Sequence, residues 1–405
     1  MTSPLHVAYL APSWPPGTGR PNGIVTALAH TVPAMIARGH RVTVLTQTLH
    51  GTAGRGALGE QVRAVETSPV SVIDRVRSRA SGPVRRYELA VNRRSNALAD
   101  ALSMVHEADP IDVVEIEESH GLAAAAQRRL SAPVIVRLHG AVQAAAEAMS
   151  ETMDDVTKAR AGRERAVALA AVGVTAPAAS TLSYYEGYAG LTETIPNPMP
   201  VQAKLEGGEA VRRGHVAFIG RIDRRKGADI AVRASALAMT QDDDLRLFLC
   251  GAEDGIDVPG EGRLSFEAFL ARFVEERFHD RFEYLGVLPG DEVSALRRGA
   301  GVVLMTSRYE NFPYSVAKAM SEGKAIVAAD TFGVGEIIED GESGILVPPA
   351  DVEATAEALV RLVTNEALAE RLGANAARRA ADVLAPSVIA AQTERFYRRV
   401  MERAP

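Results

Sequence analysis

Two cationic side chains stand close together in the segment Gly220–Gly227, which follows an apolar run, His215–Ile219, typical of a strand. Arg221 and Lys226 would therefore lie at the carboxyl end of a strand, where a helix begins. Two cations and the free amides of a helix start can hold a diphosphate there. A basic surface loop is the alternative that this segment alone leaves open.

A second helix start, at Pro313, follows the apolar run Gly301–Met305. Proline fits the first turn of a helix because its missing N–H would have no partner there. The next three amides then form an anion site at the positive end of the helix dipole; they belong to Tyr314, Ser315 and Val316. Glu310 precedes this helix and would repel an anion that it faced. We therefore expect Glu310 to accept hydrogen bonds from sugar hydroxyls, with a helix cap as the alternative.

The amino-terminal half has a glycine-rich loop, Pro12–Gly23, after the apolar run Leu5–Ala11. Such a loop lets a ligand approach the backbone closely. Its spacing is not G-x-G-x-x-G, and the next apolar run, Arg41–Thr46, is followed by Gln47 rather than by an acid that could bind a ribose. A nicotinamide-dependent enzyme is therefore disfavoured.

A histidine, His139, follows the apolar run Pro133–Leu138. At the end of a strand it could donate a hydrogen bond into a cleft, or it could be a satisfied histidine of the core. The preceding run, Asp112–Glu117, ends among further titratable side chains, namely Glu115, Glu117, Glu118 and His120. These residues make the same sheet edge a second place where chemistry could occur.

The signatures of a resident metal or of a protein nucleophile are poor. Asp242–Asp244 has the D-x-D form, but it precedes the apolar run Leu245–Cys250 and so falls at the wrong end of the sheet. The sequence has no H-E-x-x-H, no G-x-S-x-G and no Walker lysine loop. Its one cysteine, Cys250, permits neither an internal disulfide nor a thiolate metal cage. We expect no metal and no cofactor.

Short apolar runs alternate with amphipathic stretches along the chain, which is the pattern of βαβ units and parallel sheets. The fold class is therefore α/β. A proline-rich linker over residues 196–214 separates an expected amino-terminal domain, 1–195, from a carboxyl-terminal domain, 215–385. Each would be a Rossmann-like doubly wound sheet, and the two would face across a cleft that holds the ligand.

Two helices bear on this arrangement. The first is expected over Gly23–Arg38 and ends at Gly39. Pro33 lies inside it and should kink the helix or split it near Ala29. The second, over residues 386–405, has one apolar face, and we expect it to pack back on the amino-terminal domain.

The 405 residues have a net charge of -6, which disfavours nucleic acid as a partner because phosphate binding needs a concentrated positive face. No apolar run reaches the ~20 residues of a membrane-spanning helix, and we expect a cytoplasmic protein. The segment Asp74–Arg94 is the most basic, with seven arginines. It reads either as a solvated connection or as a contact for an anionic acceptor or a membrane surface. Oligomeric state is left open.

At these residues the chain resembles the GT-B glycosyltransferases, and within them glycosyltransferase family 4. The pairs Gly220-Arg221 and Lys226-Gly227 resemble the family's G-R-x4-K-G diphosphate clamp, and Ser307–Gly323 resembles its S-x-x-E-x7-E segment. Asn22-Gly23 stands where the family usually has two glycines, and His139-Gly140 resembles its strand-end His-Gly pair. The likeness covers nearly the whole length.

The resemblance implies a retaining, metal-independent transferase that moves a sugar from a nucleotide-diphosphate sugar to a small-molecule or glycan acceptor. Arg221 and Lys226 would bind the diphosphate, and Glu310 and His139 would lie near the transferred sugar. Val287 and Leu288 would lie beside the nucleobase. The other donor-binding residues would be Gly23, Gly220, Phe312, Tyr314, Ser315, Val316 and Lys318. The leaving diphosphate would take the proton of the acceptor on the same face, so no protein nucleophile is required.

Lys318 departs from the family pattern, which places a ribose-binding glutamate eight residues after Glu310. A lysine has three donors and no acceptor, so it cannot accept hydrogen bonds from two hydroxyls. We favour an altered nucleotide donor, because the other motif residues are present. The alternatives are a catalytically silent nucleotide-sugar binder and a GT-B-like sugar-nucleotide epimerase or phosphorylase. Acceptor contacts would come from the loops 48–84 and 140–157, whose composition names no chemistry.

Overall fold

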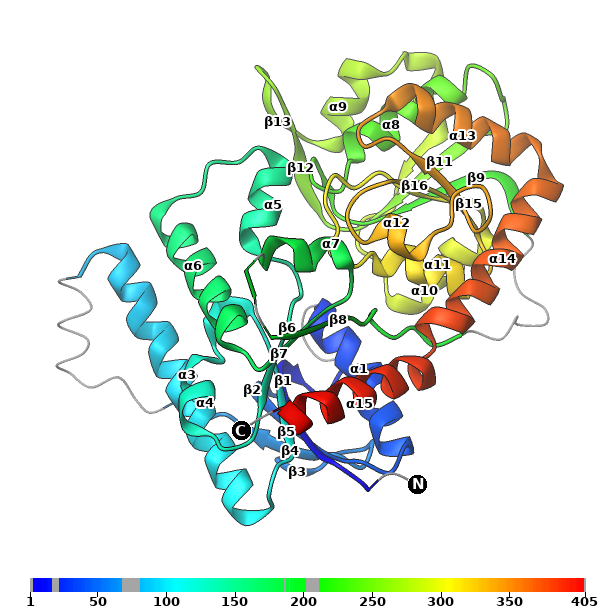
Figure 1. Cartoon of the computed structure of the whole chain (residues 1–405). Helices are drawn as coiled ribbons and strands as arrows, with labels where there is room; N and C mark the ends of the chain where they lie inside the picture. Colours follow the sequence, from blue (N-terminus) through cyan, green and yellow to red (C-terminus); the bar gives the residue numbers. More distant parts are fainter. Residues whose placement is uncertain are drawn as a thin grey trace. The chain divides into compact units, whose positions relative to one another are not determined.

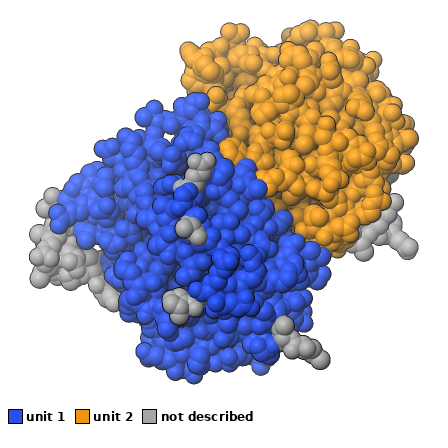
Figure 2. All heavy atoms as spheres, in the orientation of Figure 1, with its two compact units in different colours: residues 1–198, 386–405 blue, residues 199–385 orange. Residues whose placement is uncertain are grey.

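The computed structural model describes residues 3–16, 22–67, 81–185, 187–188, 190–201 and 211–403. The chain forms two compact units (Figures 1 and 2): unit 1 comprises residues 1–198 and 386–405, and unit 2 comprises residues 199–385. Both units alternate strands with helices around a mainly parallel sheet, so the α/β class is confirmed.

Unit 1 is built on an eight-stranded sheet of order β3-β4-β2-β1-β5-β6-β7-β8, in which only β3 and β4 pair antiparallel. The strands are β1 (His6–Trp14), β2 (Arg41–Leu49), β3 (Gly54–Arg55), β4 (Gln61–Ala64), β5 (Val113–Glu117), β6 (Val134–Arg137), β7 (Gly173–Ala176) and β8 (Leu191–Thr194). The four apolar runs of the amino-terminal half therefore form β1, β2, β5 and β6.

The helices of unit 1 connect these strands and cover the sheet (Figure 1). They are α1 (Gly23–Ala37), α3 (Pro83–Ala108), α4 (Ala124–Arg129), α5 (Val142–Met149), α6 (Asp155–Ala170), α7 (Ala179–Leu182) and α15 (Pro386–Arg403). Short 3-10 turns lie at Ser119–Gly121 and Ser183–Tyr185.

Helix α1 runs without interruption from Gly23 to Ala37, so the split expected near Ala29 is wrong. Pro33 removes only its own amide from the hydrogen-bond ladder, while Val32 and Met35 on either side of it are fully buried. The helix ends as expected, with Arg38 as its cap and Gly39 at a φ of 88°. Packing of the apolar face therefore outweighs the lost hydrogen bond.

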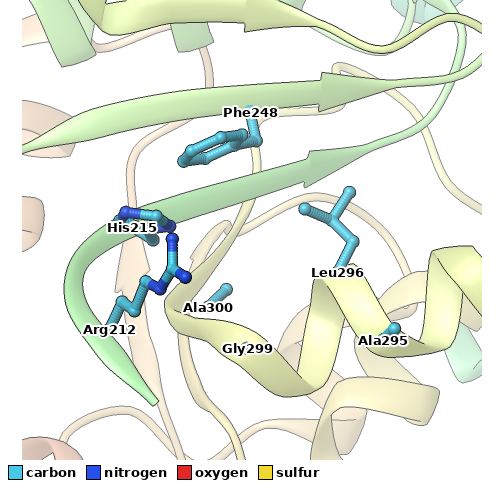
Figure 3. A pocket seen from close by; sticks show the side chains of 7 residues that line it. All are labelled: Arg212, His215, Phe248, Ala295, Leu296, Gly299 and Ala300. Carbon is cyan, nitrogen blue, oxygen red and sulfur yellow. The ribbon is translucent and has the colours of Figure 1, made fainter. Parts of the chain in front are cut away.

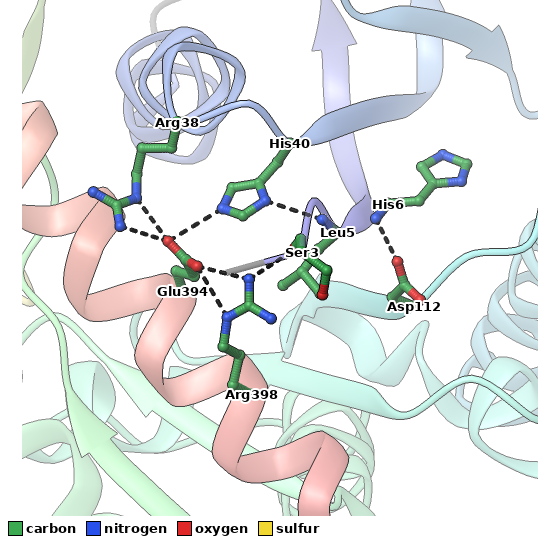
Figure 4. A network of polar contacts seen from close by, with 8 residues as sticks. All are labelled: Ser3, Leu5, His6, Arg38, His40, Asp112, Glu394 and Arg398. Atoms are coloured by element: carbon green, nitrogen blue, oxygen red, sulfur yellow. Dashed lines mark hydrogen bonds and ion pairs between the residues drawn. The ribbon is translucent and has the colours of Figure 1, made fainter. Parts of the chain in front are cut away.

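Helix α15 is part of unit 1, where Ile389, Phe396 and Val400 join the apolar cluster around β1. Its buried carboxylate, Glu394, accepts hydrogen bonds of 2.9 Å from Nε of Arg38 and from Nε of Arg398 (Figure 4). A buried carboxylate needs such partners because desolvation of its charge is costly. The carboxyl-terminal helix is therefore fixed to unit 1 by apolar packing and by ion pairs.

Unit 2 has a main sheet of six parallel strands in the order β14-β11-β9-β15-β16-β17 and a small sheet of order β10-β12-β13. The strands are β9 (Arg212–Ile219), β10 (Ile222–Asp223), β11 (Arg246–Cys250), β12 (Glu253–Val258), β13 (Gly262–Leu264), β14 (Phe282–Tyr284), β15 (Ala300–Met305), β16 (Ala325–Ala329) and β17 (Ile345–Val347). The helices are α8 (Ala228–Ala238), α9 (Phe266–Phe273), α10 (Gly290–Gly299), α11 (Tyr314–Ser321), α12 (Val334–Ile337), α13 (Val352–Thr364) and α14 (Glu366–Leu384), with a 3-10 turn at Glu276–Arg281.

Successive residues of β15 pack into two different apolar clusters. Val302 and Leu304 contribute to a cluster that contains residues of α8, α9 and α13, whereas Val303 and Met305 contribute to one that contains residues of α11, α12 and α14. Side chains alternate between the two faces of a strand, so helices cover both faces of this sheet. Unit 2 is therefore a doubly wound parallel sheet.

The segment expected as a linker differs from the expectation at both ends. Strand β9 begins at Arg212 rather than at His215, because Arg212 already pairs with Ala300 of β15. Asn197 is 1% exposed, and its Oδ1 accepts a hydrogen bond of 2.8 Å from Nη2 of Arg137 in unit 1. Residues 202–210 lie outside the described part of the chain.

Candidate functional site

The loops that follow β9 and β15 are tied to each other at the carboxyl edge of the unit-2 sheet. Gly227 has a φ of 72°, and a Cβ atom on it would lie 1.9 Å from the carbonyl oxygen of Thr306. The Thr306 hydroxyl in turn donates to the Gly227 carbonyl at 2.8 Å. Only glycine allows this approach, so it holds the start of α8 against the end of β15.

Arg308 links the same two loops through an ion pair and a hydrogen bond. Its guanidinium forms two hydrogen bonds of 2.7 Å to the carboxylate of Asp229 in α8 and a third, of 2.6 Å, to the Arg224 carbonyl. A bidentate arginine–carboxylate pair is geometrically specific. Neither Arg308 nor Asp229 was expected to matter, because their pairing depends on the fold and not on their spacing in the sequence.

Lys226 and Glu310 meet where these loops converge. The Lys226 ammonium contacts Oε1 of Glu310, and the Ser307 hydroxyl donates to the same oxygen at 2.8 Å. Glu310 is 7% exposed and Ser307 is 1% exposed. Helix α11 has no side-chain cap, so Glu310 does not act as the helix-entry cap considered above. The structure thus brings together two of the predicted site residues.

Arg221 is paired with two acids and does not share the carboxylate that Lys226 contacts. Its guanidinium lies 2.7 Å from a carboxylate oxygen of Asp223 and 2.7 Å from one of Asp254. Asp223 also accepts a hydrogen bond of 2.6 Å from the Lys226 amide. Asp223 lies between Arg221 and Lys226 in the sequence. An acid at this position could have indicated a partner for Arg221, but that partner was not predicted from the sequence.

The start of α11 supplies fewer free amides than expected. The Tyr314 amide donates to the Phe312 carbonyl at 3.1 Å, so the expectation that it is available to an anion is wrong. The Ser315 and Val316 amides have no acceptor in the described part of the chain, as is usual for the first turn of a helix. The side chains of Phe312 and Val316 are buried in the apolar core and can contribute only through the backbone.

Lys318 lies on α11 near the buried ion pair of Arg297 and Glu322. Desolvation of its ammonium group, and secondly the charge of Arg297, lower the pKa of Lys318, while Glu322 opposes the shift. Arg297 binds Glu322 through two hydrogen bonds, of 2.6 Å and 2.5 Å. Glu322, whose charge acts on the Lys318 ammonium, is therefore already paired with Arg297.

The loop after β14 presents an apolar surface at the same edge. Val287 is 73% exposed, an unusual state for valine, and Gly286 before it accepts a hydrogen bond of 2.8 Å from the Gly251 amide. The loop is thus held in place while its apolar tip faces solvent.

The predicted residues of unit 1 lie at the carboxyl edge of its own sheet. The His139 amide donates to both carboxylate oxygens of Glu118, at 2.9 Å and 2.8 Å. Burial, and secondly the charge of Arg137, lower the pKa of His139 to about 3, so its ring is neutral at physiological pH. Gly23 is the first residue of α1, where the Asn22 side chain caps the amides of Ile24 and Val25.

A cavity of about 390 Å³ in unit 2 lies away from these residues. It is lined by Arg212 and His215 of β9, by Phe248, and by the end of α10 (Figure 3). Arg212 begins β9, whereas Lys226 follows the opposite end of that strand. Ligands of doubly wound sheets bind at the carboxyl edge, so this cavity is separate from the predicted site.

No group of three metal-ligating side chains occurs among the described residues. Asp242–Asp244 precedes β11, at the amino edge of the sheet, as expected. Within the same part of the chain, no helix is long and apolar enough to cross a membrane.

Comparison with solved structures identifies the class of fold. The sucrose-phosphate synthase of Thermosynechococcus elongatus superposes with a TM-score of 0.72 over 98% of this chain and 99% of its own, at 18% identity. The Anabaena protein HepE, solved in complex with UDP and glucose, superposes with a TM-score of 0.64 over 96% of this chain and 98% of its own, at 17% identity. At such identities the likeness shows the fold alone, which is GT-B.

Sequence comparison identifies the family. Residues 206–379 match the family of glycosyl transferases group 1, and residues 21–202 match glycosyltransferase family 4. The D-inositol 3-phosphate glycosyltransferase of Saccharomonospora viridis is 25% identical over 89% of this chain and 86% of its own length. Three further curated relatives match over 38–45% of their own length, so the matched region spans less than half of each. The chain belongs to the GT-B glycosyltransferases of family 4.

Proposed function

We propose that the protein transfers a sugar, with retention at the anomeric carbon, from a nucleotide-diphosphate sugar to an acceptor hydroxyl, without a metal ion or cofactor. The observation that carries the proposal is the contact between Lys226 and Glu310 at the carboxyl edge of the unit-2 sheet. Parallel sheets bind their ligands at this edge. The ties made by Thr306 and Arg308 preorganise the two loops that supply these side chains.

The diphosphate would be gripped by Lys226 and by the free amides of Ser315 and Val316. A charge-assisted hydrogen bond is stronger than a neutral one, and the helix dipole adds to it. Arg221 would join by exchanging Asp223 or Asp254 for a phosphate oxygen, since both now hold its guanidinium. Those two acids offset the charge of Arg221 in the free site, so a diphosphate would have to compete with them for its guanidinium.

Glu310 would hold the transferred sugar. Both of its contacts, with Lys226 and with Ser307, use Oε1. Oε2 therefore remains to accept a hydrogen bond from a sugar hydroxyl. The neutral ring of His139 would supply a hydrogen-bond donor from unit 1, because an imidazole carries one N–H in this state. The exposed Val287 side chain would cover one face of the nucleobase.

The reaction needs no protein nucleophile. The bond between the anomeric carbon and the phosphate oxygen breaks, the acceptor oxygen bonds to that carbon on the same face, and the acceptor proton passes to the leaving phosphate. Negative charge grows on the phosphate as the bond breaks. Preorganised cations and amides at that position stabilise the transition state more than the ground state.

A thermal-unfolding panel of UDP, GDP, ADP and TDP and their common sugars tests the donor side. We expect one nucleotide to raise the Tm and its sugar derivative to yield product only when an acceptor mixture is present. An epimerase would release altered sugar and free nucleotide with the donor alone. Stabilisation without turnover for any acceptor would leave only a nucleotide-sugar binder.

A further inference from the structure

A cavity of about 280 Å³ in unit 1 lies between α3 and the end of β2. Two neighbouring arginines of α3, Arg93 and Arg94, line it together with Gln47, Thr48 and Thr67. None of its described lining residues is acidic. Among the described residues, the cavity therefore combines hydrogen-bond donors with positive charge and is lined by no carboxylate.

One of the two arginines has a buried donor atom that lacks an acceptor among the described residues. Nε of Arg93 is buried and has no hydrogen-bond partner in the described part of the chain. The guanidinium of Arg94 donates to Oε1 of Gln47, a neutral acceptor. A buried donor without an acceptor costs about 1–3 kcal/mol, and more for a charged group. Such a cost is recovered when a ligand supplies the acceptor.

The surroundings of the cavity are also positive. His120 lies in the turn after β5, and its Nδ1 is 3.1 Å from the Tyr87 hydroxyl of α3. Burial, and after it the charges of three arginines, lower the pKa of His120 to about 4; the arginines are Arg160, Arg94 and Arg163. A histidine that is depressed by several cations reports a positive potential at its position.

Two nearby acids do not cancel this charge. Glu164 is already engaged, because it accepts hydrogen bonds of 2.6 Å from Arg160 and 3.1 Å from the His120 amide. Burial, and secondly the charge of Glu118, raise the pKa of Glu117 to about 8, so Glu117 is mostly protonated at neutral pH. In the described part of the chain, neither Arg93 nor Arg94 therefore forms an ion pair with a carboxylate.

We propose that this cavity binds the phosphate group of a phosphorylated acceptor, with Arg93 and Arg94 as its main ligands. Planar guanidinium groups match the geometry of phosphate oxygens. The proposal rests on the proposed transferase function, since it assigns the acceptor of that reaction. The cavity lies at the carboxyl edge of the unit-1 sheet, where ligands of such a sheet bind.

Inorganic phosphate is the first probe, compared with chloride at equal ionic strength. We expect phosphate to raise the Tm of the wild-type protein and its apparent Kd to increase on the order of tenfold in Arg93→Gln and in Arg94→Gln. Arg86→Gln is the matched control, because Arg86 is an exposed arginine of the same helix. Equal protection of all four proteins would overturn the proposal.

A second pair of variants separates this cavity from the diphosphate site. Phosphate protection should persist in Lys226→Ala, whereas UDP protection should persist in Arg94→Gln. If phosphate protection is lost in Lys226→Ala and kept in Arg94→Gln, phosphate binds the diphosphate site and the proposal is wrong. If no nucleotide protects any variant, the transferase proposal fails while the phosphate result stands by itself.

Two further comparisons test whether the phosphate belongs to a soluble acceptor or to a lipid headgroup. A soluble inositol monophosphate is compared with unphosphorylated inositol as acceptor, and phosphatidylcholine vesicles with and without phosphatidylinositol are compared as a lipid source. We expect the soluble phosphate to be used with a KM that rises on the order of tenfold in Arg94→Gln while its kcat changes little. Vesicle use alone would assign the cavity to a lipid headgroup, and equal use of inositol and its phosphate would overturn the proposal.

Discussion

The ammonium of Lys226 contacts the carboxylate of Glu310, although 84 residues separate them in the sequence. The pair is asymmetric: Glu310 also accepts a hydrogen bond from the Ser307 hydroxyl, whereas Glu310 is the one acid that Lys226 contacts among the described residues. The Lys226 ammonium has three donors, so it could bind a phosphate oxygen while it keeps its contact with Glu310. If the proposed function holds, this contact would let one lysine bind the diphosphate and also orient the acid that is proposed to bind the sugar.

Replacement of Lys226 by alanine should lower the transfer rate on the order of 10²-fold, as removal of one preorganised electrostatic contact does in other enzymes. Because the contact strengthens as the diphosphate leaves, the loss should appear in kcat and in kcat/KM alike. Steady-state kinetics measure both. Lys158→Ala, at a lysine of α6 whose side chain is 60% exposed, is the control and should keep full activity. Full activity of Lys226→Ala would remove the clamp from the mechanism.

Replacement of Gly227 by alanine should destabilise unit 2 strongly, because the new Cβ would lie 1.9 Å from the Thr306 carbonyl oxygen at a φ of 72°. Gly341 has a similar φ of 71° but open space around it. Gly341→Ala should therefore lose only the about 1–2 kcal/mol that a left-handed residue costs. Urea unfolding should give a clearly larger loss for Gly227→Ala. Equal losses would mean that the loop after β9 is free to move away from β15.

Much of this arrangement could be predicted from local sequence, and the reasons for the failures are physical. The longer apolar runs form strands because burial on both faces leaves a continuous apolar signal, as in Gly301–Met305. Strands as short as β3 or β10 carry too few residues for such a signal. Pro33 predicted a break in α1 that does not occur, because the packing that holds this helix together cannot be derived from local sequence.

The site was harder to predict than the fold. Arg221 and Lys226 were predicted as site residues because two cations next to glycines stand out in the sequence, but the acids that pair with them were not predicted. Asp223, Asp254 and Asp229 are ordinary acids in the sequence, and only the fold brings them to the arginines. The Tyr314 amide was counted as free because a hydrogen bond to the Phe312 carbonyl depends on the backbone angles of Pro313.

Replacement of Lys318 by glutamate should change the nucleotide preference or lower the activity, because it restores two acceptor oxygens where the family binds a ribose. The new acid would stand four residues before Glu322 on α11, and like charges at this spacing cost about 0.2–0.5 kcal/mol. Arg297 already neutralises Glu322, so the fold should persist. Binding of UDP, GDP, ADP and TDP to both proteins measures the effect. An unchanged order and an unchanged rate would discard the altered-donor interpretation.

Glu117→Gln should make the stability of unit 1 less dependent on pH. Burial, and secondly Glu118, raise the pKa of Glu117 to about 8, above its ordinary 4.5. The folded state therefore binds more protons than the unfolded state between these values, and stability is lost as pH rises, by up to about 1.4 kcal/mol per unit. His139, with its pKa lowered to about 3, has the opposite effect, but only below its ordinary 6.5.

The window from pH 6.5 to 8 therefore separates the buried carboxyl groups of Glu117 and Glu118 from His139. Urea unfolding at several pH values should show wild-type stability falling through this window, with a shallower fall in Glu117→Gln. Part of the fall should persist, because burial and Glu164 raise the pKa of Glu118 to about 7. Glu88→Gln, at an exposed residue of α3, should follow the wild type. If the two variants have the same slope, Glu117 is ionised at neutral pH, and a carboxylate would then stand close enough to Arg94 to compete with a bound phosphate.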